Sequence, residues 1–468
     1  MLEIYLVCAP GLENILAAES RALGLRVRSV EPGGVTVDGE LRDVVRANIG
    51  LRTASRVLVR IASFRATAFH ELERSARRIA WERFIGAVPA RVRATCRKSK
   101  LYHSDAVAER VLGAIARATG TGKPDDTLQA AAPPSREKSP PKAGRAEARL
   151  KGEKGGPSRF IPVKPNAAAK TVAARAGAKQ AMASAVERAA ARSANSAPQD
   201  QAATGAAGSV TSHSHDEGDE GAGVQLVVVR LFRDECTISI DSSGVLLHRR
   251  GYRQATAKAP LRETLGAAML LGAGWTGDTP LVDPLCGAGT IPIEGALIAR
   301  RIAPGIARAE RGELAIAGWP ELPSGEIERQ AAEFRGSELP SAPVSIIGSD
   351  RDPGAIEASV ANAERAGVAA DVQFVRRVLS DAAPPGDEVG LLVANPPYGV
   401  RLGAGSDVRN LYAQLGKVAH FNFPGWTVGV LSPDRALDSQ TRLPLREAFE
   451  TTNGGIRVRY VVAAGAER

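Results

Sequence analysis

The sequence predicts an α/β protein in which a small α+β region precedes a doubly wound parallel sheet. From about residue 261 onward, apolar strands alternate with helices, which is typical of a parallel sheet whose strands are joined by crossover helices. Before residue 121, shorter strands and helices follow one another around a hairpin. A change of composition over residues 121–222 interrupts this first region. At about 150 residues per domain, the chain of 468 residues has room for about three domains.

Hydrophobic spacing identifies the elements of the first region. Helices repeat apolar residues at intervals of three and four, strands alternate them, and the run from Pro32 to Gly34 marks a hairpin turn. In order, we expect a strand in LEIYLVCA, a helix from Gly11 to Leu23, a hairpin in VRSVEPGGVTVDG, a helix in LRDVVRANIGLRTA, a strand in SRVLVRIASFRA, a helix in FHELERSARRIAWERFI, a strand in RVRATCRK and a helix in SDAVAERVLGAIARATG.

Residues 121–222 differ from both flanks in composition. They contain one aromatic residue, Phe160, few branched aliphatic residues, and an Ala-rich run among Pro and Lys residues. Such a segment cannot bury enough apolar surface to offset the entropy lost on ordering, so we expect a disordered insert. The sequence after it, VQLVVVRLFRDECTISIDSSG, predicts two paired strands. The insert is therefore expected to interrupt one small domain rather than to join two.

The second region follows a strand–helix alternation. The expected elements are a helix in LRETLGAAMLLGAG, a strand in TPLVDPLCGAGT, a helix in IPIEGALIARRIA, a strand in VSIIGSDRDP, a helix in GAIEASVANAERAG, a strand in VQFV and a strand in EVGLLVANPPYG. Residues 303–342 break the alternation and are expected to form an irregular excursion.

Charge and composition narrow the functional classes. The chain has 61 basic and 51 acidic residues, and its net charge of +10 favours a polyanionic partner, most simply nucleic acid. No apolar run approaches 18 residues, and Glu3 stands where a signal peptide would carry positive charge. The four cysteines are scattered singly, which argues against a disulfide scaffold and a zinc site. We expect a cytoplasmic protein that needs no metal and no membrane.

Three motifs in the second region carry the chemistry. The first is DPLCGAGT, residues 283–290, which ends an apolar strand and opens a helix. Gly287 and Gly289 allow a tight turn and a close approach of the backbone to a ligand, and the helix N-terminus favours a polar or anionic group of that ligand. A lone GxG is weak evidence. The sequence lacks a third glycine and a GK[ST] run here, which argues against a dinucleotide site and a P-loop.

The second motif is IIGSD, which ends at Asp350. An acidic residue at the end of the next parallel strand can accept hydrogen bonds from both ribose hydroxyls of an adenosine group. Its spacing of 67 residues from Asp283 requires the excursion to loop out. The alternative is a surface aspartate that caps the following helix.

The third motif is Asn395-Pro396-Pro397-Tyr398, directly after the apolar strand LLVA. Two successive prolines make a stiff turn without amide donors. Such a turn can offer the Asn395 side-chain oxygen and the Pro396 carbonyl to a planar amino group, with Tyr398 stacked on the ring that carries it. Two acceptors would favour a pyramidal nitrogen, whose lone pair can attack a methyl sulfonium in line.

These motifs together resemble a known family. The order DPLCGAGT, GSDRDP, ANPPYG is similar to that of class I S-adenosylmethionine-dependent methyltransferases that modify amino groups. Further phrases resemble one branch, the THUMP-domain RNA methyltransferases that modify guanine N2 in 23S rRNA. These phrases are CAPGLE (8–13), ANIGLRTASRV (47–57), SKLYH (99–103), LHRRGYR (247–253) and APLRETL (259–265). The resemblance covers roughly residues 1–118 and 223–450.

The resemblance implies a Rossmann-like class I methyltransferase domain over residues 251–468, preceded by an α+β ferredoxin-like and THUMP region. The ferredoxin-like part would span residues 1–60, and the THUMP RNA-binding domain would combine residues 61–120 with 223–250. The implied cofactor is S-adenosylmethionine, and the residues expected to bind it are Asp283, Cys286, Gly287, Gly289, Thr290, Asp350 and Asn395. Asn395, Pro396, Pro397 and Tyr398 would hold the target base and form the catalytic turn.

One departure from the family concerns the cofactor adenine. Relatives often have an acidic residue for it before the NPPY turn, whereas this chain reads FVRRVLSD with arginines near that place. We expect Asp381 to serve instead. Cys286 is more simply a small packing residue than a nucleophile.

Two clusters of basic and aromatic residues are candidate RNA contacts. Cations neutralise phosphates, and an aromatic ring can stack on an unpaired base. The first cluster follows one strand and the second lies at the junction of the two regions. Their expected RNA-binding members are Arg97, Lys98, Lys100, Tyr102, Arg249, Arg250 and Arg253. For each cluster alone, a solvated charged face is an equally good explanation.

Other functions remain open on the sequence alone. The favoured substrate is guanine N2 in 23S rRNA or a pre-ribosomal particle, and tRNA guanine N2 is the nearest rival. A DNA adenine methyltransferase would share the NPPY turn but not the THUMP-like region. A non-catalytic RNA-binding or ribosome assembly factor could lose Asn395 or the glycine loop, and both are present.

Overall fold

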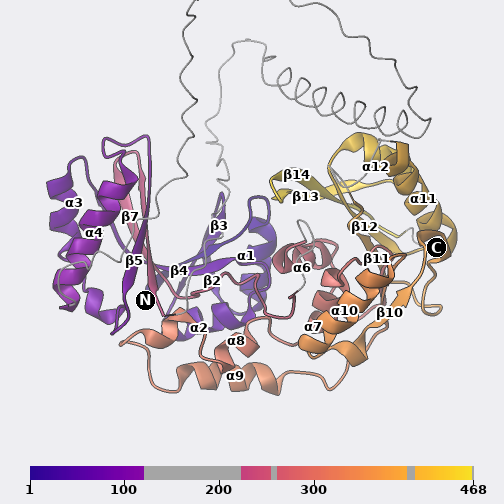
Figure 1. The fold of residues 1–468 in the computed structure, drawn as a ribbon, viewed down its shortest axis with the longest axis horizontal. Coiled ribbons are helices and arrows are strands. Elements are labelled where there is room, and N and C mark those ends of the chain that lie inside the picture. Colours follow the sequence, from indigo (N-terminus) through magenta and orange to yellow (C-terminus); the bar gives the residue numbers. More distant parts are fainter. Residues whose placement is uncertain (121–222, 255–260, 398–405, 466–468) are drawn as a thin grey trace, which may run out of the picture. The chain divides into compact units, whose positions relative to one another are not determined.

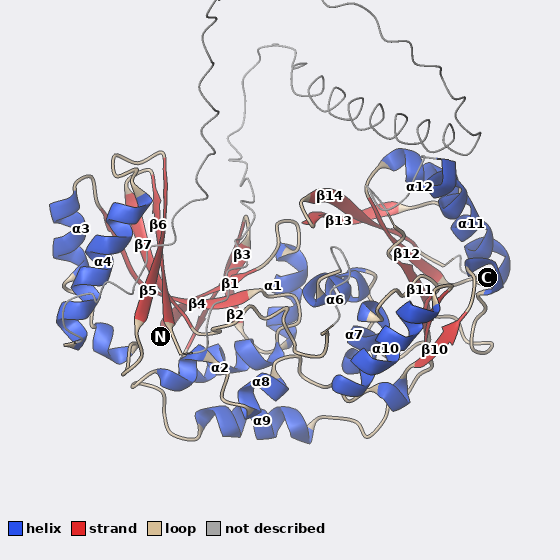
Figure 2. Ribbon diagram, in the orientation of Figure 1, coloured by secondary structure: helices blue, strands red, loops and turns tan. Residues whose placement is uncertain are grey.

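The structure is a computed structural model that describes residues 1–120, 223–254, 261–397 and 406–465 (Figures 1 and 2). These residues contain two seven-stranded sheets. The strand order is β2-β3-β1-β4-β7-β6-β5 in the first sheet and β10-β9-β8-β11-β12-β14-β13 in the second. Within the described ranges, no helix is both long and apolar enough to cross a membrane.

The first sheet and its helices match the elements expected before and after the insert. They are β1 (Leu2–Val7), α1 (Glu13–Ala22), β2 (Arg26–Glu31), β3 (Gly34–Gly39), α2 (Leu41–Gly50), β4 (Arg56–Arg65), α3 (Phe69–Ala76), η1 (Trp81–Arg83), β5 (Ala90–Arg97), α4 (Ser104–Thr119), β6 (Gln225–Phe232) and β7 (Glu235–Asp241). One expected helix is divided into α3 and the short η1. The buried Trp81 accounts for the break, because its indole Nε1 donates a 2.9 Å hydrogen bond back to the Ala76 carbonyl.

The insert interrupts one sheet, as expected. β5 and β6 lie on either side of it in the sequence and pair in parallel from Ala90 with Gln225 to Arg97 with Phe232. Residues 121–222 themselves lie outside the described residues. The sheet is also continuous across the boundary expected at residue 60, because β4 pairs with β1 on one side and with β7 on the other.

The second sheet is doubly wound, as the alternation of strands and helices predicts. Its elements are α6 (Glu263–Gly272), β8 (Leu281–Asp283), α7 (Thr290–Ala299), α8 (Ile306–Glu310), η2 (Ala315–Gly318), α9 (Glu326–Gly336), β9 (Ile346–Asp350), α10 (Pro353–Arg365), η3 (Ala369–Asp371), β10 (Gln373–Arg376), η4 (Leu379–Asp381), β11 (Leu391–Ala394), α11 (Ser406–Asn422), β12 (Thr427–Ser432), α12 (Arg435–Thr441), β13 (Arg446–Asn453) and β14 (Ile456–Ala463). Strands β10, β9, β8, β11 and β12 are parallel, and β14 is antiparallel to β12.

Neighbouring residues along the central strands enter different cores. Leu391 of β11 belongs to the core that includes Ile293 of α7, whereas Leu392 belongs to the core that includes Tyr412 and Leu415 of α11. Successive strand residues point to opposite faces of a sheet, so helices cover both faces. Figure 2 shows α7 and α10 on one side of β11 and α11 on the other.

Residues 303–342, expected to be irregular, contain α8, η2 and α9 and bind to the elements of the first sheet. We call this segment the strap. The Gly305 amide donates to the Ile49 carbonyl at 2.9 Å, and the Trp319 indole donates to the Gln225 side-chain oxygen at 2.8 Å. Arg308 donates to the Ser243 carbonyl at 2.9 Å. The strap therefore joins the two sheets through directional polar contacts as well as burial.

A second connection runs through the segment of residues 247–253, which we call the linking segment. Arg250 forms a bidentate ion pair with Glu294 of α7, with Nε–Oε1 and Nη2–Oε2 distances of 2.9 and 3.2 Å. Both side chains are almost completely buried. Tyr252 donates its hydroxyl to the same carboxylate at 3.0 Å, and Arg250 also reaches the Arg52 carbonyl at 2.8 Å. α7 is thus fixed from the first region.

We expect Glu294→Ala to lower the free energy of unfolding by about 3–5 kcal/mol, because it leaves Arg250 buried without its counter-charge. Urea unfolding followed by circular dichroism measures this. The matched control is Arg457→Ala, which breaks the exposed ion pair with Glu450 and should change stability little. If Glu294→Ala does not fold, the apolar pair Arg250→Met with Glu294→Leu should restore folding. A loss in Glu294→Ala no larger than in the control would contradict this role.

Candidate active site

The three sequence motifs meet at one edge of the second sheet. Parallel strands present their carboxyl ends on the same edge, and Asp283, Asp350 and Asn395 end or directly follow β8, β9 and β11. β8 lies between β9 and β11. The chain proceeds from β8 to β9 and β10 on one side, and β11 leads to β12 on the other. Such a reversal of strand order is where open α/β sheets bind ligands.

Backbone conformation explains the two glycines of the first motif. Gly287 has φ of +54° and Gly289 has φ of +80°, the left-handed region that glycine adopts without a steric penalty. A Cβ on Gly289 would lie 3.0 Å from the Phe374 ring and from the Ser359 Cβ, whereas a Cβ on Gly287 would project into open space. Gly289 therefore permits close packing, and Gly287 leaves room above the loop.

Asp350 closes the glycine loop onto β9. Its carboxylate accepts from the Gly287 amide at 3.1 Å through Oδ2 and from the Asp352 amide at 3.0 Å through Oδ1. The helix cap is a different residue: Asp352 is the N-cap of α10 and accepts from the Gly354 amide. The sequence alternative, in which Asp350 caps this helix, is therefore wrong. Each Asp350 oxygen retains a further lone pair for a ligand hydroxyl.

Asp283 is a buried carboxyl group. Its side chain is 1% exposed and accepts from the Leu285 amide at 3.0 Å. Burial, together with the nearby charge of Asp350, raises the pKa of Asp283 to about 8, and the hydrogen bond from the Leu285 amide opposes this rise. A cation placed next to this group would stabilise its charged form. An ammonium group of a ligand is such a cation.

The Asn395 side chain presents an unused acceptor. Its Oδ1 is buried and has no hydrogen-bond partner among the described residues. A buried polar oxygen without a partner is costly, so it indicates a site that a ligand donor completes. Pro396 is buried and Pro397 half-buried after it. Tyr398, expected to stack on the base, lies outside the described residues.

The other residues predicted to bind the cofactor lie in two different surroundings. Thr290 is buried at the start of α7, and Cys286 is buried with its Sγ 4.0 Å from the Ser359 hydroxyl. Burial raises the pKa of the Cys286 thiol well above its ordinary value, which fits a packing residue rather than a nucleophile. Asp381 ends η4 and is exposed, with its Oδ1 accepting from the Ser380 hydroxyl at 2.9 Å. It follows β10, next to β9 in the sheet.

In the first predicted RNA cluster, Lys98, Lys100 and Tyr102 are exposed in the loop after β5, and Arg97 at the end of β5 is half-buried. The Lys100 amide donates to Asp234 at 2.7 Å, which joins the loop after β5 to the turn between β6 and β7. Tyr102 is 69% exposed, with its ring 4.1 Å from that of His103. Two arginines that the sequence analysis missed lie beside these residues: Arg230 in β6 and Arg233 in the turn that follows it, with guanidinium carbons 5.8 and 5.2 Å from the centroid of the Phe232 ring. We call this set the basic tip: Arg97, Lys98, Lys100, Tyr102, Arg230 and Arg233.

The second predicted RNA cluster is largely internal, which corrects two assignments. Arg250 is buried and pairs with Glu294, so it is not available to phosphate. Arg253 is mostly buried and donates to the Leu261 carbonyl at 2.8 Å and to Glu263 at 2.7 Å. Only Arg249 of the three predicted contacts is exposed. A cation-rich run has the same composition whether it faces solvent or partners in the interior, and here the partners are distant in sequence.

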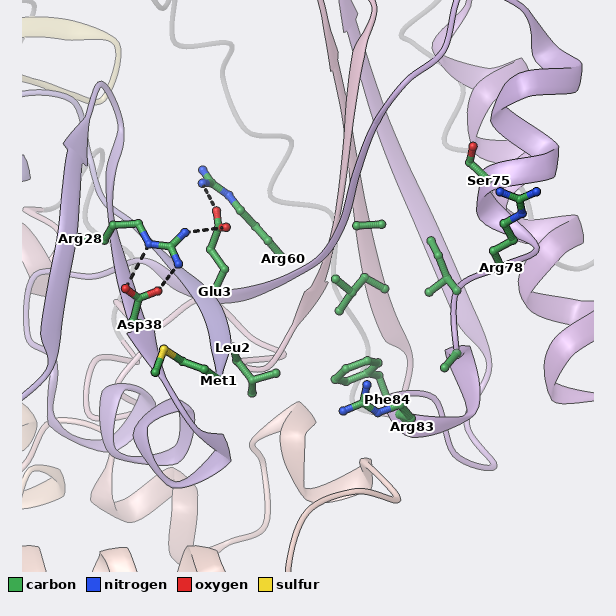
Figure 3. Close-up of a pocket in the computed structure, with 14 residues that line it drawn as sticks. Met1, Leu2, Glu3, Arg28, Asp38, Arg60, Ser75, Arg78, Arg83 and Phe84 are labelled. Atoms are coloured by element: carbon green, nitrogen blue, oxygen red, sulfur yellow. Dashed lines mark hydrogen bonds and ion pairs between the residues drawn. The ribbon is translucent and has the colours of Figure 1, made fainter.

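A polar cleft of about 700 Å³ lies on the first region, away from the three motifs (Figure 3). Its lining includes Arg28 and Arg60, which point toward acidic side chains. Arg28 pairs with both Asp38 and Glu3, and Arg60 donates to Glu3 at 2.7 Å. Because these cations already have carboxylate partners, we assign the cleft no ligand.

Sequence reasoning missed Glu294 and Asn362. Both are completely buried, and Asn362 of α10 donates to the Ala288 carbonyl in the glycine loop at 2.9 Å. Glu294 did carry a signal, since it is the one charged residue of the apolar helix TIPIEGALIA. A charge inside a buried helix indicates a buried partner.

Comparison with known families identifies two parts of the chain. Residues 250–461 match the model of the RMKL-like methyltransferase domain, and residues 3–58 match that of the RlmL ferredoxin-like domain. These findings confirm the predicted class I methyltransferase domain and ferredoxin-like region.

Several curated relatives carry methyltransferase names. A Syntrophotalea carbinolica protein named ribosomal RNA large subunit methyltransferase K/L is 30% identical over 98% of this chain and 53% of its own length. A protein of that name from Allochromatium vinosum is 42% identical over 49% of this chain and 32% of its own length. This chain thus spans about a third to a half of these relatives. The putative RNA methyltransferase YpsC of Bacillus subtilis is 28% identical over 96% of this chain and 92% of its own.

Two solved structures have a similar fold. A predicted N6-adenine-specific DNA methylase from Listeria monocytogenes has a TM-score of 0.70 and 27% identity, and the match covers 99% of this chain and 96% of that one. SMU.472, a putative methyltransferase complexed with SAH, has a TM-score of 0.71 and 22% identity, over 100% and 99% of the two chains.

We expect the ligand-free protein to lose stability as the pH rises from about 4 to about 8, with no further loss from this group above that. The pKa of Asp283 is higher in the folded protein than in the unfolded chain. Its contribution to the free energy of unfolding is therefore complete below the unfolded pKa, and it is lost progressively as the pH rises to the folded pKa. Asp283→Asn should remove this component. Urea unfolding of both forms at pH 5 to 9 measures it, and parallel pH curves for the two would contradict the assignment.

Proposed function

Because the chain joins an RlmL ferredoxin-like domain to an RMKL-like methyltransferase domain, we propose that it methylates an exocyclic amine of a base in RNA. The methyl donor is S-adenosylmethionine, and the favoured target is guanine N2 in 23S rRNA. The observation that carries the proposal is the buried, unpartnered Oδ1 of Asn395 directly after β11. The names of the ribosomal RNA methyltransferase K/L relatives support the choice of RNA.

The residues at the strand ends fit this donor. S-Adenosylmethionine supplies an electrophilic methyl group on a sulfonium, together with an ammonium, a carboxylate and a ribose. The buried Asp283 carboxyl suits the ammonium, which would compensate its burial. Asp350 retains lone pairs for the ribose hydroxyls. The open space over Gly287 allows close approach. Asp381, exposed after β10, is the candidate for the adenine amino group.

The Asn395 turn suits the acceptor base. An exocyclic amine is a poor nucleophile because its lone pair is delocalised into the ring. The Asn395 Oδ1 and the Pro396 carbonyl can each accept one amino hydrogen, which favours a pyramidal nitrogen with its lone pair directed out of the ring plane. As the N–C bond forms, the bond between the methyl carbon and the sulfonium sulfur breaks and its electron pair stays on the sulfur, while the amine loses one proton to solvent. The proline pair keeps the acceptors in place, so little reorganisation precedes the reaction.

RNA contact is assigned to the basic tip and Arg249. The tip combines exposed cations with the exposed ring of Tyr102, which suits phosphates flanking an unpaired base. The target guanine must itself leave its stack to reach the Asn395 turn. The name of the Listeria structure favours a second candidate, N6-adenine in DNA. The RlmL ferredoxin-like domain favours RNA, and product analysis separates the two.

We expect Asn395→Ala to lower methyl transfer by roughly 100-fold or more, because it removes a fixed acceptor from the reacting amine. Binding of S-adenosylhomocysteine should change by less than about threefold. Transfer of labelled methyl from S-adenosylmethionine to 23S rRNA, tRNA and duplex DNA measures the first, and calorimetry measures the second.

The matched control is Asn453→Ala, which removes an asparagine at the end of β13 in the same domain. Full activity of Asn395→Ala would contradict the mechanism. A labelled product that migrates as N6-methyladenosine rather than N2-methylguanosine would replace the proposed substrate.

Replacing Lys98 and Lys100 by Ala should weaken RNA binding and flatten its salt dependence. Each lost phosphate contact lowers the slope of log K against log salt by about 0.7–0.9. Titration of 23S rRNA fragments at several salt concentrations measures the slope. Arg457→Ala, which removes an exposed cation from β14, is the control. Equal slopes in the double variant and the control would remove the basic tip from the RNA-binding surface.

A further inference from the structure

We propose that Asn362 and Arg365 of α10 are positioning residues that fix the glycine loop in the form that binds the methyl donor. Neither is among the residues placed on the donor or the base. The inference deepens the proposed function, because the ligand of the loop comes from that proposal. It rests on a continuous set of contacts from the linking segment to the loop carbonyls.

α10 holds the glycine loop through two buried side chains. The Asn362 Nδ2 donates to the Ala288 carbonyl at 2.9 Å, and the Ser359 hydroxyl lies 2.8 Å from the Gly287 carbonyl. Both side chains are completely buried. The Ser359 hydroxyl also lies 2.8 Å from Ala355 O in its own helix, so its one hydrogen is shared between two acceptors. For the Asn362 contact, the interactions of the described residues include no second donor to the Ala288 carbonyl.

These contacts compensate for a weakness of the loop. Two glycines make the loop free to adopt many conformations, and fixing them costs more entropy than fixing other residues. Side chains that hold successive carbonyls select one of those conformations. The loop amides donate to other groups: the Gly287 amide to the Asp350 carboxylate and the Gly289 amide to the Cys286 carbonyl.

Arg365 connects this brace to the linking segment. Its guanidinium donates to the Oδ1 of Asn362, which orients the amide so that Nδ2 faces the loop. Its Nε donates to the Tyr252 carbonyl at 2.6 Å. Asn362 thus has its acceptor and one donor satisfied by different parts of the chain, and its rotamer is determined by both.

Tyr252 supports both helices that adjoin the loop. Its hydroxyl donates to Glu294 of α7, the helix that begins at Thr290, while its carbonyl accepts from Arg365 of α10. Glu294 is in turn paired with Arg250. Arg250 and Tyr252 lie two residues apart in the linking segment. Together they fix α7, which follows the glycine loop, and α10, whose side chains hold the loop carbonyls.

The test compares Asn362→Ala, Asn362→Asp and Arg365→Met with a matched control in the full chain. The control is Asn48→Ala, which also removes a buried asparagine that donates to a backbone carbonyl, Val44 O, at 2.9 Å. Asn362→Asp retains an acceptor for Arg365 but, when ionised, cannot donate to Ala288. Three quantities are measured: the Kd for S-adenosylhomocysteine, amide hydrogen exchange of residues 283–290 without ligand, and the midpoint of thermal unfolding.

Both Asn362 variants should raise the Kd roughly five- to 100-fold, and Arg365→Met should raise it about two- to fivefold. All three should exchange faster over residues 283–290. Asn48→Ala should lower the unfolding midpoint without either effect. An unchanged Kd and unchanged exchange in Asn362→Ala, with only the midpoint lowered, would overturn the proposal.

Failure of the proposed function is distinguishable from failure of this inference. If the unmodified chain does not bind S-adenosylhomocysteine, the proposed function is wrong. The exchange measurement still decides the positioning role, because it needs no ligand: faster exchange in Asn362→Ala supports it, and equal exchange overturns it.

Discussion

The buried ion pair between Arg250 and Glu294 is the interaction on which the rest of the arrangement depends. Neither charged side chain would be stable in the interior alone, because the free-energy cost of removing a charge from water is offset only when that charge is paired and hydrogen-bonded. Here the guanidinium also reaches the carbonyls of Arg52 and Leu247, and the carboxylate also accepts from Tyr252. These directional requirements fix α7 against the first region, and α7 begins where the glycine loop ends.

The candidate site uses the same low-polarity interior for chemistry. Asp283 is kept from water, so its charge is stabilised mainly by a cation that arrives with a ligand. Asn395 presents an acceptor that the described residues leave unpartnered. Both groups end or follow strands that are neighbours at the switch point of the sheet. In the arginine cleft of the first region, by contrast, Arg28 and Arg60 already pair with the carboxylates of Asp38 and Glu3.

Local signals predicted much of the fold and the centre of the site. Periodic strands and helices, the GxG turn and the NPPY turn are short-range patterns, and the structure places Asp283, Asp350 and Asn395 at one sheet edge as expected. Long-range partners were not predictable. The docking of the strap on β6 and α2 depends on partners far away in the sequence, and Arg250 looked like an RNA contact because its partner, Glu294, is 44 residues away. Asn362 gave no signal in the sequence, because the role of a buried side-chain amide depends on the carbonyl that it contacts in the folded chain.

We propose that this chain methylates guanine N2 in large-subunit ribosomal RNA through Asn395. Mass spectrometry of nucleosides from separated 23S rRNA and tRNA tests it most directly, in cells lacking the chain and in cells complemented with the natural chain or with Asn395→Ala. We predict that N2-methylguanosine in 23S rRNA falls without the chain, returns with the natural chain and does not return with Asn395→Ala. Unchanged N2-methylguanosine in 23S rRNA, or a loss confined to tRNA, would contradict the claim.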